Sequence, residues 1–125
     1  MIYLDTHVVV WLYASGTKQL SPRACELIER SAEVLISPVV LLELKFLHEI
    51  GKVMVAPQVI FDYLSARISL EICELEFKEV VRSAMGQTWT RDPFDRLITA
   101  QATLKNSVLI TKDRLIRDHY PQAVW

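Results

Sequence analysis

The sequence predicts an α/β fold in which helices cover both faces of a central parallel sheet of four to five strands. Short apolar stretches of strand length alternate with longer stretches whose apolar residues recur at helical spacing. Several of the longer stretches begin with Ser-Pro or Asp-Pro, a pair that suits the N-cap and the first position of a helix. Strands that alternate with helices in this way predict parallel pairing through right-handed crossovers.

The composition indicates one compact domain over residues 1–125 with a sizeable core. The chain is 51% hydrophobic and 23% charged, and its formal net charge is -1. A nearly neutral chain has no general attraction for nucleic acid, so such contacts must come from basic residues near a site. Cys25 and Cys73 lie in apolar patterns without CxxC spacing, which favours reduced thiols in the core over a zinc site.

The sequence gives no sign of a targeting or membrane segment. Ile2–Leu4 has the pattern of a strand and leaves no room for a signal peptide. The apolar run Val8–Ala14 is much too short to span a bilayer. We therefore expect a cytoplasmic protein.

Strands are predicted where a short apolar run lies between polar or helix-starting residues. In chain order these runs are Ile2–Leu4, Val34–Ile36, Ser69–Leu75, Ser107–Ile110 and a short edge strand within Pro121–Trp125. Each connection between them contains at least one stretch with helical spacing.

Helices are predicted from their start signals and from apolar residues at helical spacing. In order they are Val8–Ala14, a helix starting at Pro22, Val39–Ile50, a helix starting at Pro57, Phe77–Met85, Pro93–Leu104 and a short helix after Asp113. Gly51 is expected to end the third helix. The inner faces of the second and fourth helices are expected at Ala24, Leu27, Ile28, Ala32, Val59, Ile60, Tyr63 and Leu64.

The stretch Arg91–Ile98 combines a helix start with two carboxylates. Asp92 suits the N-cap, and Asp95 at the third helical position favours the positive end of the helix dipole. That structural interpretation explains Asp92 well. It explains Asp95 less well, because Asp95 shares a helix face with the small residues Thr99 and Ala102, which leaves room beside the carboxylate.

Two further acids, Asp5 and Asp113, directly follow predicted strands. Each is also suited to cap the helix that comes next, and Thr111 competes with Asp113 for that role. Ligands of parallel sheets bind beyond the carboxyl ends of the strands, where the strand order reverses. If the strands ending at Leu4 and Ile110 are neighbours, the two acids face each other across that crevice.

Glu43 lies within an apolar helical run. Its own helix face carries Val39, Phe46, Leu47 and Ile50. Burying an unpaired carboxylate is costly, so a metal ion, a proton or a basic partner is expected beside it. The structural alternative is an ion pair with Arg96 or Lys45.

Four carboxylates in one cleft call for a cation. Carboxylates are hard oxygen donors, which suit Mg²⁺ or Mn²⁺. The histidines His7, His48 and His119 are widely separated in sequence and form no cluster. His7 is close to Asp5 and is either a substrate contact or a packed or solvated residue.

These residues resemble the PIN-domain ribonucleases, and most closely the VapC-type toxins of bacterial type II toxin-antitoxin modules. The matching pieces are Ile2–His7, Glu43 within Ser37–Leu44, Arg91–Ala100 and Leu109–Asp113. The resemblance implies a three-layer α/β/α fold and Mg²⁺- or Mn²⁺-dependent cleavage of RNA. It also implies an acidic quartet formed by Asp5, Glu43, Asp95 and Asp113. Asp92 matches a common residue of this subgroup that is not a primary ligand, and Thr99 departs from the small apolar residue expected there.

In this interpretation Asp5, Asp95 and Asp113 bind the metal directly or through water, and Glu43 is a ligand or orients the attacking water. Candidate phosphate contacts, each equally suited to a solvated surface, are Lys45, Arg91, Arg96, Lys112 and Arg114. Trp89 either stacks on a base of single-stranded RNA or packs against the protein. The resemblance further implies a homodimer whose site is blocked by the carboxy-terminal segment of an antitoxin.

Two alternatives come from other classes of protein. A phosphorylatable receiver domain needs an Asp at the end of the third strand, and none occurs near Leu75-Glu76. A haloacid-dehalogenase-type phosphatase needs a second Asp two residues after Asp5, where His7 stands. A PIN domain that binds RNA or a partner without cutting is a further alternative, against which the intact quartet argues.

Overall fold

The computed structural model describes all 125 residues and contains one five-stranded parallel sheet. The strands are β1 Ile2–Leu4, β2 Val34–Ile36, β3 Leu70–Ile72, β4 Val108–Ile110 and β5 Ala123–Val124. Their order is β3-β2-β1-β4-β5, and every pair is parallel. The predicted sheet is confirmed, and its strand order reverses between β1 and β4.

The third strand is shorter than the predicted Ser69–Leu75. Ser69 has a left-handed backbone with φ 54°, which turns the chain out of α4 immediately before β3. Beyond Ile72, the N–H of Cys73 still donates to the carbonyl of Ile36 at 2.8 Å, but regular pairing ends there. No Asp follows this strand, which argues against the receiver-domain alternative.

The helices lie where start signals and apolar spacing predict them. They are α1 Thr6–Ser15, α2 Pro22–Arg30, α3 Pro38–Glu49, α4 Pro57–Ile68, α5 Phe77–Met85, α6 Pro93–Leu104 and α7 Arg114–His119. The bounds of α5 and α6 are as predicted. By contrast, α1 starts two residues earlier than Val8, because Asp5 caps it directly.

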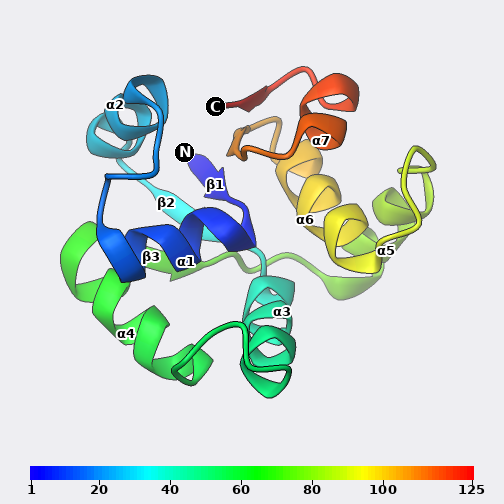
Figure 1. The fold of residues 1–125 in the computed structure, drawn as a ribbon. Helices are drawn as coiled ribbons and strands as arrows, with labels where there is room; N and C mark the ends of the chain where they lie inside the picture. Colours follow the sequence, from blue (N-terminus) through cyan, green and yellow to red (C-terminus); the bar gives the residue numbers. More distant parts are fainter.

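Helices cover both faces of the sheet, as Figure 1 shows. The connections from β1 to β2 and from β2 to β3 place α1 to α4 on one face, and the connections through β4 place α5 to α7 on the other. The result is the predicted three-layer α/β/α arrangement, with the reversal of strand order at its centre.

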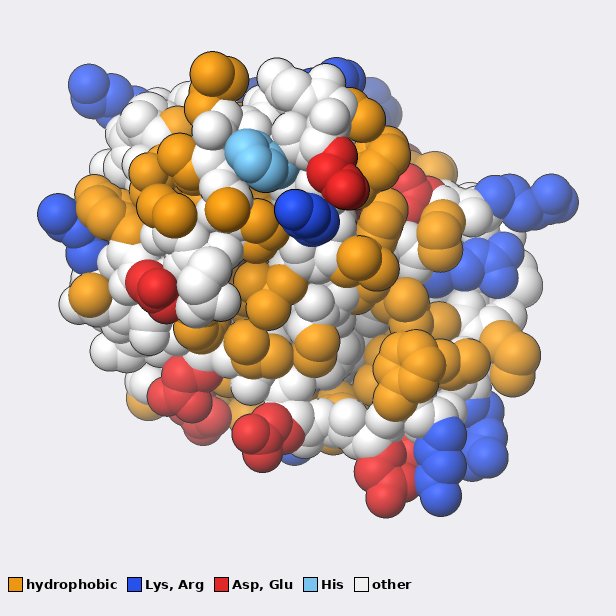
Figure 2. Space-filling model, turned by 90° about the horizontal axis from the view of Figure 1, so that it is seen from below, with side chains coloured by type: hydrophobic (Ala, Val, Ile, Leu, Met, Phe, Trp, Pro, Cys, Tyr) orange, Lys and Arg blue, Asp and Glu red, His pale blue; other side chains and the backbone are white.

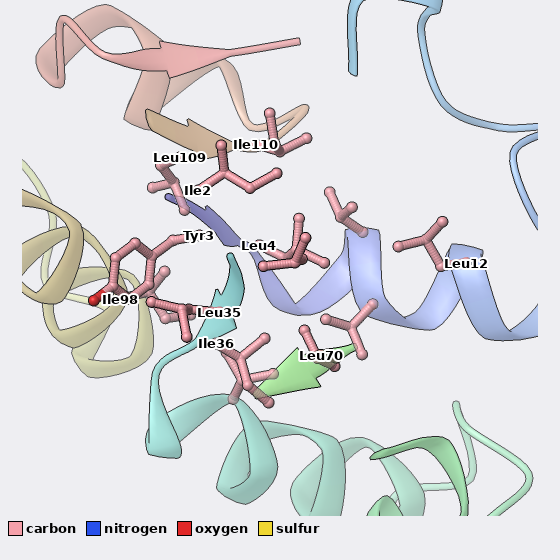
Figure 3. Close-up of a cluster of buried hydrophobic side chains, with 14 of the residues drawn as sticks. Ile2, Tyr3, Leu4, Leu12, Leu35, Ile36, Leu70, Ile98, Leu109 and Ile110 are labelled. Atoms are coloured by element: carbon pink, nitrogen blue, oxygen red, sulfur yellow. The ribbon is translucent and has the colours of Figure 1, made fainter. Parts of the chain in front are cut away.

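The core is built on β1, whose side chains alternate between the two faces of the sheet (Figure 3). Tyr3 points toward α6, where Ile98 lies, and Leu4 points toward α1. These three side chains are almost fully buried and belong to a cluster of 26 buried apolar residues. Both cysteines are free thiols, as predicted, and only Cys73 is fully enclosed.

Three positions predicted on the inner faces of the second and fourth helices are exposed instead. They are Ala32, Val59 and Tyr63. Ala32 lies beyond the end of α2, and the other two lie on the exposed side of α4. Phe46 and Ile50, which were expected on the same helix face as Glu43, are exposed as well. Figure 2 shows this end of the molecule, with apolar side chains spread between separated charges. None of the seven helices combines the length and the apolar character that a membrane-spanning helix needs.

Candidate metal centre

The four acids of the quartet line one cleft of about 340 Å³ at the carboxyl ends of β1 and β4. Because β1 pairs with β4, Asp5 and Asp113 follow neighbouring strands, as predicted. The residues that line this cleft are Asp5, His7, Trp11, Glu43, Asp92, Asp95, Lys112 and Asp113. Residues distant in sequence therefore meet where the strand order reverses, the position at which parallel sheets bind ligands.

Asp5 is the most enclosed acid of the cleft, with an exposed fraction of 6%. Its Oδ1 accepts from the N–H of Thr6 at 2.8 Å, and its Oδ2 accepts from the hydroxyl of Thr111 at 2.6 Å. Burial raises the pKa of Asp5, and the two hydrogen bonds partly oppose that rise. Asp5 is thus both the cap of α1 and a fixed oxygen donor on the cleft wall.

Glu43 projects from α3 and is half-buried. The hydroxyl of Thr6 donates to its Oε1. Neither Arg96 nor Lys45 forms an ion pair with Glu43, so the structural alternative of a basic partner is wrong. Burial raises the pKa of Glu43, and the charge of Asp5 raises it further.

The two acids at the start of α6 have different roles in the helix but share the cleft. Asp92 is the N-cap, because its Oδ1 accepts from the N–H groups of Phe94 and Asp95 at 2.8 and 3.1 Å. The Asp95 side chain makes no hydrogen bond within the protein. The pKa of Asp95 is raised to about 7. Burial is the largest cause, repulsion from Asp92 is the next, and the other three acids of the quartet raise the pKa further.

The small residues on the face of Asp95 do not supply the room that the sequence suggested. Thr99 and Ala102 are fully buried and do not line the cleft. The Thr99 hydroxyl has no hydrogen-bond partner. The cleft beside Asp95 is lined instead by residues of α1 and α3 and by residues that follow β1 and β4.

Asp113 caps α7, because its Oδ1 accepts from the N–H of Ile116 at 3.0 Å. The N–H of Asp113 in turn donates to the hydroxyl of Thr111 at 3.0 Å. Thr111 therefore joins Asp5 to Asp113 by accepting from one residue and donating to the other. The sequence left open whether Thr111 or Asp113 caps the last helix, and in the structure Asp113 is the N-cap of α7.

Five carboxyl groups line the cleft, and Lys112 is the one lysine or arginine beside them. The structure contains four ion pairs, and none of them includes a cleft carboxylate or Lys112. Unpaired carboxylate oxygens are the donor set that Mg²⁺ and Mn²⁺ prefer. In their present conformations no three of these side chains are arranged to hold a metal ion together. Binding a cation here would require side-chain rotation or bridging water.

Most of the basic and aromatic candidates lie outside the cleft. Lys112 lines it, whereas Lys45, Arg91, Arg96 and Arg114 do not. Arg96 turns away and donates from Nε to the carbonyl of Thr90 at 2.7 Å. Trp89 stacks on His119, with ring centroids 5.3 Å apart, and donates to Gln87. Packing is therefore the role of Trp89 that the structure shows.

Sequence reasoning missed Trp11 as a cleft residue and the two threonines that hold the carboxylates. Trp11 sits in an apolar run that gives no sign of an exposed side. Its spacing of four residues from His7 was the available signal, because residues four apart share one helix face. Thr6 and Thr111 each stand one or two residues from an acid, but their partners are distant in sequence.

The PIN domain family model matches residues 2–120 of the chain. Ribonuclease VapC22 of Mycobacterium tuberculosis is 29% identical over 130 residues, which cover 99% of this chain and 98% of the relative. A crystal structure of VapBC2 from Rickettsia felis, bound to a DNA fragment of its promoter, matches with a TM-score of 0.67 and 23% identity, over 99% of this chain and 96% of that chain. A toxin-antitoxin complex from Klebsiella pneumoniae matches with a TM-score of 0.69 and 18% identity, over 100% of this chain and 97% of that chain.

Proposed function

The chain belongs to the PIN domain family, and we propose on that basis that it is a Mg²⁺- or Mn²⁺-dependent endoribonuclease, the toxin of a toxin-antitoxin pair. The observation that carries the proposal is the cleft of carboxylates without basic partners at the reversal of strand order. A relative of similar length is named a ribonuclease, which supports RNA as the substrate.

We assign metal binding to Asp5, Asp95 and Asp113. The bound cation would lower the pKa of a water molecule and stabilise the charge that develops on the phosphate. Asp5 is held by Thr6 and Thr111, so its oxygens are oriented before any ligand arrives. Asp95 and Asp113 face the same space from α6 and from the end of β4.

Glu43 is either a further ligand or the group that orients the attacking water. Burial raises the pKa of Glu43, which makes this carboxylate a stronger proton acceptor than an exposed glutamate. The hydroxyl of Thr6 fixes one of its oxygens and leaves the other for the cleft. Lys112, which also lines the cleft, is suited to contact a phosphate of the RNA strand.

The proposed partner is an antitoxin whose carboxy-terminal segment covers the cleft and presents a basic side chain to the acids. The apolar surface of α3 next to Glu43 supports this proposal, because Leu42, Phe46 and Ile50 are at least 48% exposed. Phe46 also lies 6.3 Å from the ring of Phe94, at the start of α6 beside Asp95. Homodimer formation, a single domain over residues 1–125 and a cytoplasmic location stay predictions.

RNA cleavage by the purified protein tests the enzymatic part. We expect cleavage of single-stranded or structured RNA in Mn²⁺ or Mg²⁺, its loss in excess EDTA and its return when Mn²⁺ is added back. Asp95→Asn should remove most of the activity. Asp62→Asn is the matched control, because Asp62 is exposed on α4 and lies outside the cleft. Cleavage that persists in EDTA would refute the proposal.

Expression in bacteria tests the toxin part. Expression of the wild-type chain alone should slow growth, and Asp95→Asn should relieve that effect. Co-expression with the product of a small adjacent reading frame should restore growth, and the two proteins should co-purify. Equal toxicity of wild type and Asp95→Asn would show that slow growth does not arise from the cleft.

A further inference from the structure

One side of the cleft is aromatic rather than acidic. Trp11 is the single hydrophobic residue of the lining, and it is only half-buried. His7 lies one helical turn earlier on α1, with its ring centroid 6.1 Å from that of Trp11. The mechanism above uses neither ring, so this surface needs a separate explanation.

Two other segments converge on Trp11. Trp125, which follows β5, packs against it in a T-shaped contact with ring centroids 5.6 Å apart. The Lys112 ammonium lies 5.8 Å from the centroid of Trp11 and 6.0 Å from that of Trp125. Both rings therefore attract the cation and help to keep it beside the cleft. Lys112 forms no ion pair with any carboxylate.

We infer that Trp11, supported by Trp125, stacks on a nucleobase next to the scissile phosphate, while Lys112 contacts a backbone phosphate. This inference rests on the proposed function and adds how the substrate is recognised. Stacking on aromatic rings and a cation beside them are the two contacts by which proteins hold single-stranded nucleic acid. Carboxylates alone would repel an RNA strand, so the cleft needs such contacts to bind it.

Two consequences follow for the substrate. The stacked nucleotide must be unpaired, because a base inside a duplex does not present its face to a side chain. Purines should bind better than pyrimidines, because a larger ring system gives a larger stacking surface. Recognition would thus depend on an unpaired purine rather than on hydrogen bonds to one particular base.

Binding of three labelled strands tests the inference: oligoadenylate, oligouridylate and an abasic ribose-phosphate strand of equal length. Fluorescence anisotropy gives each Kd with Ca²⁺ in place of Mn²⁺, and gel electrophoresis checks that the strands stay intact. Wild type should bind oligoadenylate tightest and the abasic strand weakest. Trp11→Leu should weaken oligoadenylate binding roughly 5- to 150-fold, which corresponds to the ~1–3 kcal/mol of one stacked base. The abasic strand should lose much less, because Trp11→Leu affects it only through Lys112, which Trp11 helps to hold beside the cleft.

Two variants serve as comparisons. Lys112→Gln should weaken the binding of all three strands alike and lower its salt dependence, as expected for a phosphate contact. Tyr13→Leu is the matched control, because Tyr13 is a half-buried aromatic of α1 that packs on Tyr63 outside the cleft. If Trp11→Leu does not fold, Trp11→Phe gives the same test with a smaller expected loss.

The outcomes separate this inference from the proposed function. An equal loss for oligoadenylate and the abasic strand in Trp11→Leu, or no loss, would overturn base stacking and leave the nuclease proposal intact. Binding that depends on Trp11 without any cleavage in Mn²⁺ would overturn the nuclease proposal and support the stacking site. No binding of any strand by wild type would overturn both.

Discussion

Replacing Asp95 with asparagine should stabilise the metal-free protein at neutral and alkaline pH. Burial and the neighbouring acids raise the pKa of Asp95 from 3.8 to about 7. The folded state therefore holds this proton more tightly than the unfolded chain does. The resulting stability is fully present below about pH 4 and is lost as the pH rises to about 7, so ionised Asp95 destabilises wild type above that pH.

The pKa difference sets the size of the effect. The interval from 3.8 to about 7 corresponds to at most about 4 kcal/mol of unfolding free energy. Solvent entry and side-chain motion reduce the repulsion, so we expect about 2 kcal/mol at pH 8. For a chain of this length the melting temperature should rise by roughly 5–10 °C. The gain should shrink steadily as the pH is lowered toward 4.

Melting curves of wild type, Asp95→Asn and the control Asp62→Asn, recorded in EDTA between pH 5 and 8, measure this effect. Saturating Mn²⁺ should then reverse the order at pH 8. Wild type should gain about 2.7 kcal/mol at a hundred times the dissociation constant, and Asp95→Asn should gain much less. A gain in Asp95→Asn that does not change with pH, or no gain at pH 8, would refute the assignment of Asp95 to a crowded acidic cleft.

Three further substitutions test other parts of the site. Asp92→Asn should keep the start of α6, since asparagine is also a good N-cap. It should lower the pKa of Asp95, so melting curves of this variant should show the loss of stability ending at a lower pH than in wild type. Thr111→Val removes a buried hydroxyl that donates to Asp5, and denaturant unfolding should show a loss of about 1–3 kcal/mol. Glu43→Gln should lower kcat for RNA cleavage by about 100-fold or more if Glu43 handles the proton of the attacking water, and unchanged kcat would restrict Glu43 to a structural role.

Local patterns were sufficient to predict the sheet and most helices. The Ser-Pro and Asp-Pro starts placed α2, α3 and α6, because the cap and the fixed φ of proline are properties of adjacent residues. The pairing of β1 with β4 was expected only conditionally, since no local pattern states which strands are neighbours. Val59 and Tyr63 on α4 were mispredicted as inner positions, because helical spacing shows that residues share a face but not what covers it.

The acids of the site were predictable because each follows a strand or interrupts an apolar run. What they contact was not. The hydrogen bond from Thr111 to Asp5 joins residues 106 apart in sequence, and the hydroxyl of Thr6 reaches Glu43 on another helix. From the sequence, Asp92 was predicted to be only a helix N-cap and not a member of the quartet. The structure shows that Asp92 caps α6 and is the strongest electrostatic neighbour of Asp95.

The central claim is that the acidic cleft binds a divalent cation, and calorimetric titration with Mn²⁺ at pH 7 tests it most directly. Wild type should bind Mn²⁺ and release protons, measured as different heats in buffers of different ionisation enthalpy, because Asp95 with a pKa of about 7 is then partly protonated. Asp95→Asn should bind more weakly and release fewer protons, and Asp62→Asn should match wild type. The absence of Mn²⁺ binding by wild type, or identical binding and proton release by Asp95→Asn, would contradict the claim.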